Sequence, residues 1–124
     1  MEIIAKSKYI HISPRKVRLV ANLIKGMEVA HAETELAHHP KHASLPIAKL
    51  LHSAIANAKH NFSIEEQGLY IQDIAVGAGP VLKRTRARAF GRAAMIRKRM
   101  SHISIVLAEN KAAGNVKFKN QNEK

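Results

Sequence analysis

The residues best suited to chemistry form one run of basic side chains between positions 83 and 99. Eight of these seventeen residues are Lys or Arg, and no acidic residue occurs between Asp73 and Glu109. An arginine guanidinium can grip a phosphate with two parallel hydrogen bonds and can also stack on a base. Small residues between the arginines, such as Ala89 and Gly91, let a backbone run close to nucleic acid. Solvated loops usually mix charge signs, so we interpret the run as a site of RNA or DNA contact.

The composition agrees with a polyanion as partner. The chain has 124 residues, a formal net charge of +12 and a pI near 10.4. Self-repulsion of that size opposes compaction unless a partner neutralises it. Hydrophobic residues make up 46% of the chain but aromatic residues only 4%, which predicts one domain with an aliphatic core. The absence of Cys excludes disulfides, thiol catalysis and Cys-based zinc sites.

The elements that position the basic run can be predicted from periodicity and capping residues. Residues 2–12 favour an extended segment, and Ser13-Pro14 favours an N-cap followed by a helix that ends at Gly26. Further helices are predicted over residues 28–37 and about 42–61, and strands over 69–76 and 102–108. Residues 1–110 should form a single domain, and the polar, basic sequence from Lys111 predicts a disordered tail, residues 111–124.

The basic run therefore lies at the end of a hairpin. Two extended arms of about ten residues, at about 3.3 Å per residue, would reach roughly 30 Å beyond the sheet. Such an arm has no apolar face and would be unstable alone, so we expect it to be ordered only inside its partner.

Two further polar patterns are open to more than one interpretation. The first helix carries Arg15, Arg18, Asn22 and Lys25 on one face, which suits either a second nucleic-acid contact or an ordinary amphipathic helix. Lys49, Ser53, Asn57 and Asn61 are each four apart on the third helix. Asparagine can read RNA sugars and base edges, although a solvated helix face is the commoner explanation.

Other chemistries find little support. His38, His39 and His42 cluster beside Pro40, but their spacing matches no standard zinc site, and solvated loop histidines are favoured. No phosphate loop, nucleophile elbow or poised carboxylate pair is present. We therefore expect no metal, no cofactor, no small-molecule substrate and no enzymatic activity. The apolar runs are too short to span a bilayer and the N-terminus lacks the features of a signal peptide, which predicts a cytosolic protein without a membrane partner.

Three blocks of sequence resemble the large-subunit ribosomal protein twenty-two family, of the universal, bacterial type. They are SPRKVRLVANLIKG at 13–26, LHSAIANAKHN at 51–61, and GPVLKR at 79–84 continuing through RAFGRA at 88–93 to KRMSHISIV at 98–106. The blocks follow the family's order and separation, and the likeness covers about residues 2–109.

The resemblance implies an α+β fold in which three helices pack on a three-stranded antiparallel sheet with a long protruding β-hairpin. It implies a structural protein of the large ribosomal subunit in the cytoplasm, which supports early subunit assembly. Its partners would be large-subunit ribosomal RNA, neighbouring large-subunit ribosomal proteins and, transiently, the nascent peptide. The hairpin would be about Gly79 to Met100, close to where macrolides bind in such proteins, and would line the peptide exit tunnel.

The RNA-binding residues expected on these grounds are Ser13, Arg15, Lys16, Arg18, Lys25, Lys49, Ser53, Asn57, Asn61, Lys83, Arg84, Arg86, Arg88, Arg92, Arg97, Lys98, Arg99 and His102. The expected tunnel-lining tip is Arg86, Ala87, Arg88, Ala89, Phe90, Gly91 and Arg92. The chain departs from the family at Ala87, where a proline is usual, and at Phe90, where a basic or small residue is usual. These departures put the shape of the tip in question.

Three competing functions are weaker. A DNA-binding regulator could use the two helices joined through Gly26, but the second helix carries Glu28, Glu33 and Glu35, which would repel phosphate. An enzyme acting on RNA lacks a catalytic group. A membrane-surface carrier lacks an apolar face on its basic arm.

Overall fold

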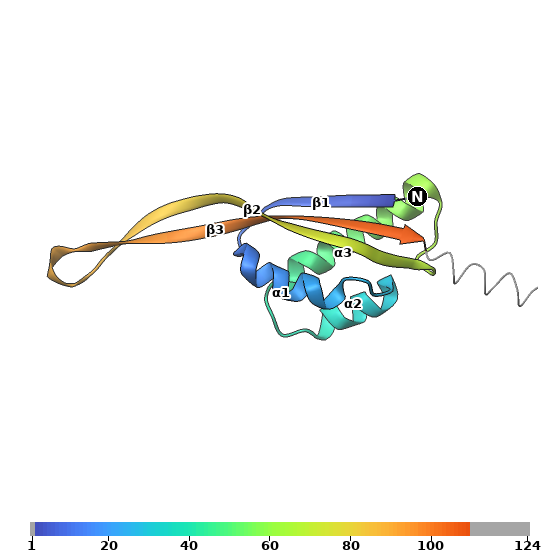
Figure 1. Ribbon diagram of the computed structural model, residues 1–124, viewed down its shortest axis with the longest axis horizontal. Helices are drawn as coiled ribbons and strands as arrows, with labels where there is room; N and C mark the ends of the chain where they lie inside the picture. Colours follow the sequence, from blue (N-terminus) through green and yellow to red (C-terminus); the bar gives the residue numbers. More distant parts are fainter. Residues whose placement is uncertain (1, 110–124) are drawn as a thin grey trace, which may run out of the picture.

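The structure, a computed structural model, describes residues 2–109. Its elements are β1 (Glu2–Ile10), α1 (Pro14–Ile24), α2 (Val29–His38), α3 (Ser44–Phe62), β2 (Leu69–Ala87), a short 3₁₀ turn (Ala89–Gly91) and β3 (Ala93–Glu109). The strands form one antiparallel sheet in the order β1-β3-β2 (Figure 1). The predicted α+β fold of three helices on a three-stranded antiparallel sheet is therefore confirmed. The predicted tail lies outside the described residues.

The helices cover one face of the sheet. On the central strand, Ile103, Ile105 and Leu107 are buried, while the residues between them point to the other face and are half-buried. Helix α1 packs beside β2, α3 packs beside β1, and α2 packs on α3. The core is aliphatic, as the composition predicts, with Ile, Leu, Val and Ala from every helix and strand of this layer.

Helix α1 begins and ends where its sequence predicts. Ser13 occupies the N-cap position and Pro14 the first turn, although the Ser13 side chain makes no capping hydrogen bond. Gly26 follows the helix with a φ of +85°, a conformation that glycine adopts without a steric penalty. Its backbone N–H donates to the Ile71 carbonyl at 2.9 Å, and the Ile71 N–H donates to Met27 at 2.9 Å. The α1–α2 turn is thus fastened to the free edge of β2, where the sheet would otherwise expose unpaired groups.

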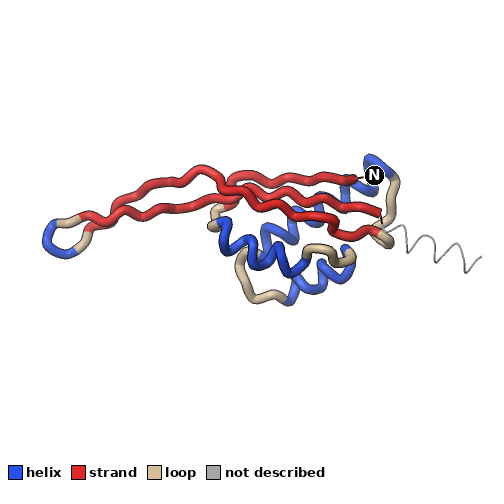
Figure 2. The backbone as a smooth tube through the Cα atoms, in the orientation of Figure 1, coloured by secondary structure: helices blue, strands red, loops and turns tan. Residues whose placement is uncertain are grey.

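The two long strands run without interruption from the core into a protruding hairpin, as Figure 2 shows. The sequence predicted strands at 69–76 and 102–108 and an extended hairpin of about Gly79 to Met100 between them; in the structure β2 and β3 join these segments into two unbroken strands. A shift in the pairing register between Ala78 and Val81 marks the point of departure. Pro80 falls inside this irregularity, where its missing N–H costs no ladder hydrogen bond. We call residues 79–100 the arm, and the helices with residues 2–10, 69–78 and 101–109 the globular region.

Candidate nucleic-acid interface

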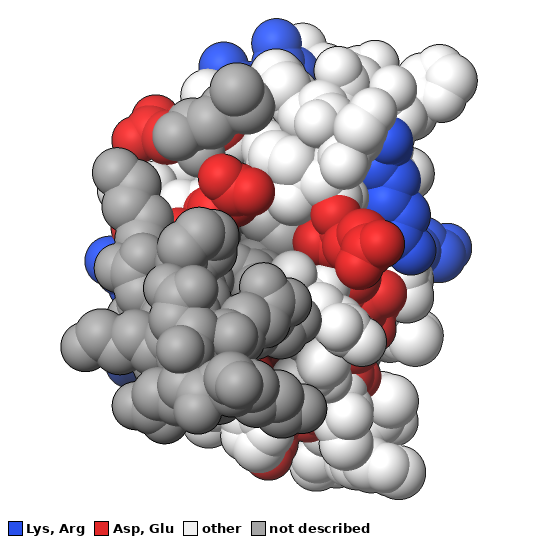
Figure 3. All heavy atoms as spheres, turned by 90° about the vertical axis from the view of Figure 1, so that its right-hand side faces the viewer, with Lys and Arg blue, Asp and Glu red and all other residues white. Residues whose placement is uncertain are grey.

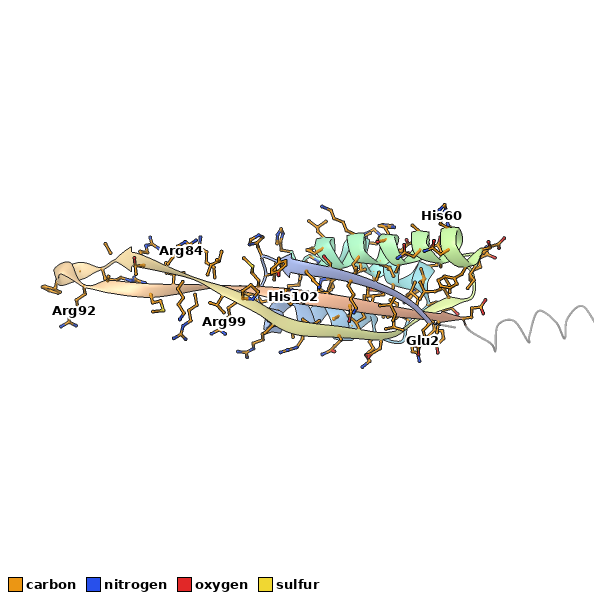
Figure 4. The ribbon with its side chains drawn as sticks, turned by 90° about the horizontal axis from the view of Figure 1, so that it is seen from above. Glu2, His60, Arg84, Arg92, Arg99 and His102 are labelled. Atoms are coloured by element: carbon orange, nitrogen blue, oxygen red, sulfur yellow. The ribbon has the colours of Figure 1, made fainter. Side chains whose placement is uncertain are left out.

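The arm carries basic side chains on both of its faces. In an antiparallel pair, directly opposed residues share a face and successive residues alternate. Val81, Lys83, Thr85 and Ala87 are paired with Arg99, Arg97, Met95 and Ala93, which defines the Lys83 face. Leu82, Arg84 and Arg86 are paired with Lys98, Ile96 and Ala94, which defines the Arg84 face. Each face therefore has three basic residues, and Figure 4 shows Arg84 and Arg99 on opposite sides of the arm.

Among residues 2–109, the charged side chains of the arm form no ion pairs. Lys83 lies directly opposite Arg97, and like charges in that position repel each other. Every ion pair formed among residues 2–109 lies in the globular region, and none involves a Lys or Arg of the arm. The guanidinium of Arg84 reaches only the neighbouring Lys83 carbonyl, at 3.0 Å. An external polyanion would relieve this repulsion, because it supplies the missing negative charge.

The tip is a tight turn held by backbone hydrogen bonds. The Arg88 N–H donates to the Arg92 carbonyl at 2.7 Å, directly beyond the last strand pair, Ala87 with Ala93. Phe90 and Gly91 follow each other with positive φ angles of 61° and 69°. The left-handed conformation suits Gly91 but is rare for a bulky residue such as Phe90. The Phe90 side chain is 99% exposed, so the turn projects an uncovered ring from the end of the arm.

A basic cleft lies where the arm joins the globular region. It encloses about 810 Å³ between the start of α1, the α2–α3 loop and the arm strand β3. Its lining contains both basic and apolar residues. The lining residues are His11, Ile12, Ser13, Lys16, Leu19, Lys41, His42, Ala43, Arg97, Lys98 and Arg99. The structure thus brings together Ser13 and Lys16 with the root of the arm, which the sequence placed far apart.

Two other cations of this segment, Arg18 of α1 and Lys25 directly after it, contact β2 instead. Arg18 donates from its guanidinium to the Val76 carbonyl on β2 at 3.1 Å. Lys25 forms an ion pair with Asp73 at 3.0 Å. That hydrogen bond and charge hold the pKa of Asp73 below its ordinary value of 3.8. Arg18 and Lys25 therefore help to hold α1 against β2, although both stay exposed, as Arg15 does.

The four polar residues predicted on one face of α3, Lys49, Ser53, Asn57 and Asn61, do not all lie at the same site. Lys49 and Ser53 line a groove of about 510 Å³ between α3 and β1, together with Lys6, His11 and His42. Asn57 and Asn61 lie further along the helix, outside this groove. The groove therefore adds only Lys49 and Ser53 to the basic surface near the arm.

The opposite end of the globular region is acidic. Figure 3 looks at this end and shows Asp and Glu side chains across it, with Lys and Arg at its margins. Burial, and then the neighbouring Glu66 carboxylate, raise the pKa of Glu33, while His52 and Lys59 act in the opposite direction. The ion pairs His52–Glu33 at 3.1 Å and Lys59–Glu66 at 3.7 Å belong to this region. The molecule is therefore polarised, with a basic arm at one end and acidic side chains at the other.

Some basic residues near the arm were missed in the sequence. Lys41, His42 and His11 line the cleft or the groove, and only the fold brings their loops to the arm. Lys6 and Lys8 alternate with buried or half-buried residues, so the period of two could have identified them as one polar face of β1. Within residues 2–109, no cluster of three or more His, Asp or Glu is arranged to hold a metal ion. None of the described helices is long and apolar enough to cross a membrane.

These features define a class: a small α+β domain that presents a long, doubly basic hairpin, a surface typical of nucleic-acid-binding proteins. Comparison with known proteins identifies the family. Residues 5–108 match the family described as ribosomal protein L22p/L17e, and the chain belongs to this family. Its members are structural ribosomal proteins and not enzymes, and a member of the bacterial type is located in the cytoplasmic ribosome.

Individual bacterial relatives agree over nearly the whole chain. The large ribosomal subunit protein uL22 of Halothermothrix orenii is 50% identical over 111 residues, which cover 90% of this chain and 98% of the relative. The protein of the same name from Desulfitobacterium hafniense strain DCB-2 is 49% identical over 107 residues, which cover 86% of this chain and 94% of the relative. The family suggested by the three sequence blocks is therefore confirmed.

Proposed function

We propose that this protein is a structural constituent of the large ribosomal subunit, in which the arm binds large-subunit ribosomal RNA and its tip lines the nascent-peptide exit tunnel. The observation that carries the proposal is the presence of basic side chains on both faces of the arm, without partners in the described chain. A hairpin that lay on a flat surface would need only one basic face. Two basic faces suit an arm that RNA surrounds.

The base of the arm, residues 97–99, offers a second contact to RNA, and this contact would fix the direction of the arm. The basic cleft joins Lys16 of α1 to Arg97, Lys98 and Arg99 of the arm. A phosphate backbone bound there would be held by the globular region and the arm at once. Binding distant RNA segments with one rigid protein would favour their correct arrangement, which supports a role in subunit assembly. The rest of the proposed RNA-binding set is Ser13, Arg15, Arg18, Lys25, Lys49, Ser53, Asn57, Asn61 and His102.

The tip has a different role in this proposal. Phe90 is exposed and lies at the end of the arm, next to Arg88 and Arg92. In a tunnel wall its ring would stack on a base or narrow the passage for the nascent peptide. Replacing Phe90 by Lys and comparing the density of the tunnel wall in large subunits tests a narrowing role. An unchanged wall would count against it.

The proposal is tested by shortening the arm. Val81 lies opposite Arg99, so residues 82–98 can be replaced by an Asn-Gly turn that suits a two-residue hairpin. The aliphatic core lies outside this segment, so the shortened chain should keep its fold. We expect normal circular dichroism and a loss of stable incorporation into large subunits. A full-length control with Lys59→Gln, a lysine outside the proposed RNA-binding set, should incorporate normally. Normal incorporation of the shortened chain would refute the proposed role of the arm.

A further inference from the structure

A bulge in β1 places two residues opposite one on the central strand. Ser7 is paired with Ile103 and Ile10 with Ser101, so Lys8 and Tyr9 both lie opposite His102. Tyr9 has a φ of 59°, which is rare for an aromatic residue, and its side chain is 59% exposed. Bulges often redirect a side chain at a functional position. Here the bulge brings the Tyr9 ring to the ring of His102, with centroids 5.0 Å apart and planes at 88°.

The His102 ring is fixed in place from two sides. The Tyr9 backbone N–H donates to His102 Nδ1 at 3.1 Å. Because Nδ1 accepts this hydrogen bond, it is not free to bind a ligand, and the ring can offer its face. The ring also packs over Gly79, where an added Cβ would lie 3.2 Å from His102 Cε1. Figure 4 shows His102 at the end of β1, where the arm leaves the globular region.

A hollow of about 270 Å³ is lined by His102 on the sheet face that the helices leave uncovered, and Tyr9 borders it through its contact with His102. The hollow is lined by the small residues Ser104, Ala75 and Gly77, and by Lys6 and Lys8 from β1. Drug-sized ligands occupy pockets of about 300–1,000 Å³, so this volume suits a single flat ring system. The site is separate from the cleft lined by Lys16 and Arg97, which lies between the arm root and the helices.

We propose that this hollow binds one unpaired nucleotide of RNA, with its base against His102 and the exposed Tyr9 ring that His102 contacts, and its phosphate near Lys6 and Lys8. Single-stranded RNA is commonly recognised by stacking of bases on aromatic side chains beside basic groups. Two rings at right angles offer a face and an edge, so a base stacked on one ring meets the edge of the other. The inference rests on the proposed RNA-binding function but adds a site outside the arm and the cleft.

The test measures binding of a fluorescent single-stranded RNA tetranucleotide to the full-length protein at several salt concentrations. Stacking on an aromatic side chain contributes enough for Tyr9→Ala to weaken binding about tenfold or more. Its salt dependence should stay unchanged, because no phosphate contact is lost. Lys8→Gln should instead make the log–log salt slope less steep by about 0.7, the value for one phosphate contact on a single strand. Tyr9→Phe should bind like the original chain, because it keeps the ring.

Matched controls separate this inference from the proposed function. Phe62→Ala removes another exposed ring, at the C-terminal end of α3, and Lys59→Gln removes another exposed lysine. Both should leave binding unchanged. If Tyr9→Ala binds the tetranucleotide as tightly as Phe62→Ala, the nucleotide site is refuted, while incorporation of the protein into large subunits still tests the arm. If Tyr9→Ala spares RNA binding but releases another ribosomal protein from washed subunits, the hollow binds protein and the inference is again overturned.

Discussion

The globular region and the arm are built from the same two strands but are stabilised in different ways. In the globular region, β2 and β3 pack on three helices and bury an aliphatic core. In the arm the same strands have no layer to pack on, and their charges repel each other. Eight of the chain's 21 Lys and Arg lie in residues 83–99, a segment that contains no acidic residue. The other 13, and all 9 acidic residues, lie outside this segment. The strand pairing is thus common to both regions, and the rest of the arm's stabilisation must come from a partner.

The largest expected effect distinguishes the two regions by their packing. Leu51 is fully buried on α3, and Leu51→Ala should lower the free energy of unfolding by about 2–5 kcal/mol. Leu82 is only half-buried in the arm, so Leu82→Ala should cost less than about 1 kcal/mol. Urea unfolding of the two variants makes the comparison. A similar loss in the free energy of unfolding for both variants would show that the arm is part of the cooperative core.

The second expected effect concerns strain at the tip. Phe90 has a φ of 61°, and the left-handed conformation costs about 1–2 kcal/mol for a residue other than glycine. Phe90→Gly should therefore favour the turn and slow hydrogen exchange of the Arg88 amide, which donates to Arg92. Gly91→Ala, which adds strain at φ 69°, serves as the opposite control and should speed this exchange. Faster hydrogen exchange of the Arg88 amide in Phe90→Gly would show that Phe90 does not strain the turn.

A smaller effect should follow from the repulsion between Lys83 and Arg97. Opposed like charges destabilise a strand pair by roughly 0.2–1 kcal/mol, so Lys83→Gln should increase the protection of neighbouring arm amides in the free protein. Hydrogen exchange followed by NMR measures the change. Lys59→Gln is the control, because Lys59 faces Glu66 in the globular region. Reduced protection in Lys83→Gln would show that repulsion does not govern the arm.

The smallest effect tests the ion pairs of the globular region. The Lys25 ammonium lowers the pKa of Asp73, so the stability from this pair is present above the ordinary pKa of 3.8 and is lost as the pH falls through the lower folded-state pKa. Lys25→Ala should raise the pKa of Asp73 toward 3.8, as measured by an NMR titration. Lys59→Ala should leave Asp73 unchanged. An unchanged pKa in Lys25→Ala would exclude the pair in solution.

Much of the fold followed from local sequence signals. The apolar spacing of Val17, Val20 and Ile24 predicted the inward face of α1, and Pro14 and Gly26 marked its limits. The third helix begins at Ser44, two residues later than predicted, because the residues before it form a turn in which the Ser44 hydroxyl donates to the Lys41 carbonyl at 2.7 Å. The continuity of the core strands with the arm was not predicted, because Gly79 and Pro80 normally interrupt strands, whereas an irregularity in the pairing accommodates them here.

The candidate site was less predictable, because part of it depends on contacts between distant segments. The charge run identified the arm, since that signal is contiguous in the chain. The cleft could not be predicted, because Lys16, Lys41 and Arg97 meet only after the sheet has formed. Nor could the sequence show that Arg18 and Lys25 contact β2, since their spacing alone fits either a free basic face or a packed helix.

The central claim is that RNA surrounds the arm, and the salt dependence of RNA binding tests it face by face. Eight phosphate contacts predict a log–log slope of about −6 for the full-length protein. One variant neutralises the Lys83 face (Lys83→Gln, Arg97→Gln, Arg99→Gln), and another the Arg84 face (Arg84→Gln, Arg86→Gln, Lys98→Gln). Each should make the slope less steep by about 2, because each removes three contacts. If only one variant changes the slope, the arm lies on an RNA surface with its other face free. That result would refute the claim that RNA surrounds the arm.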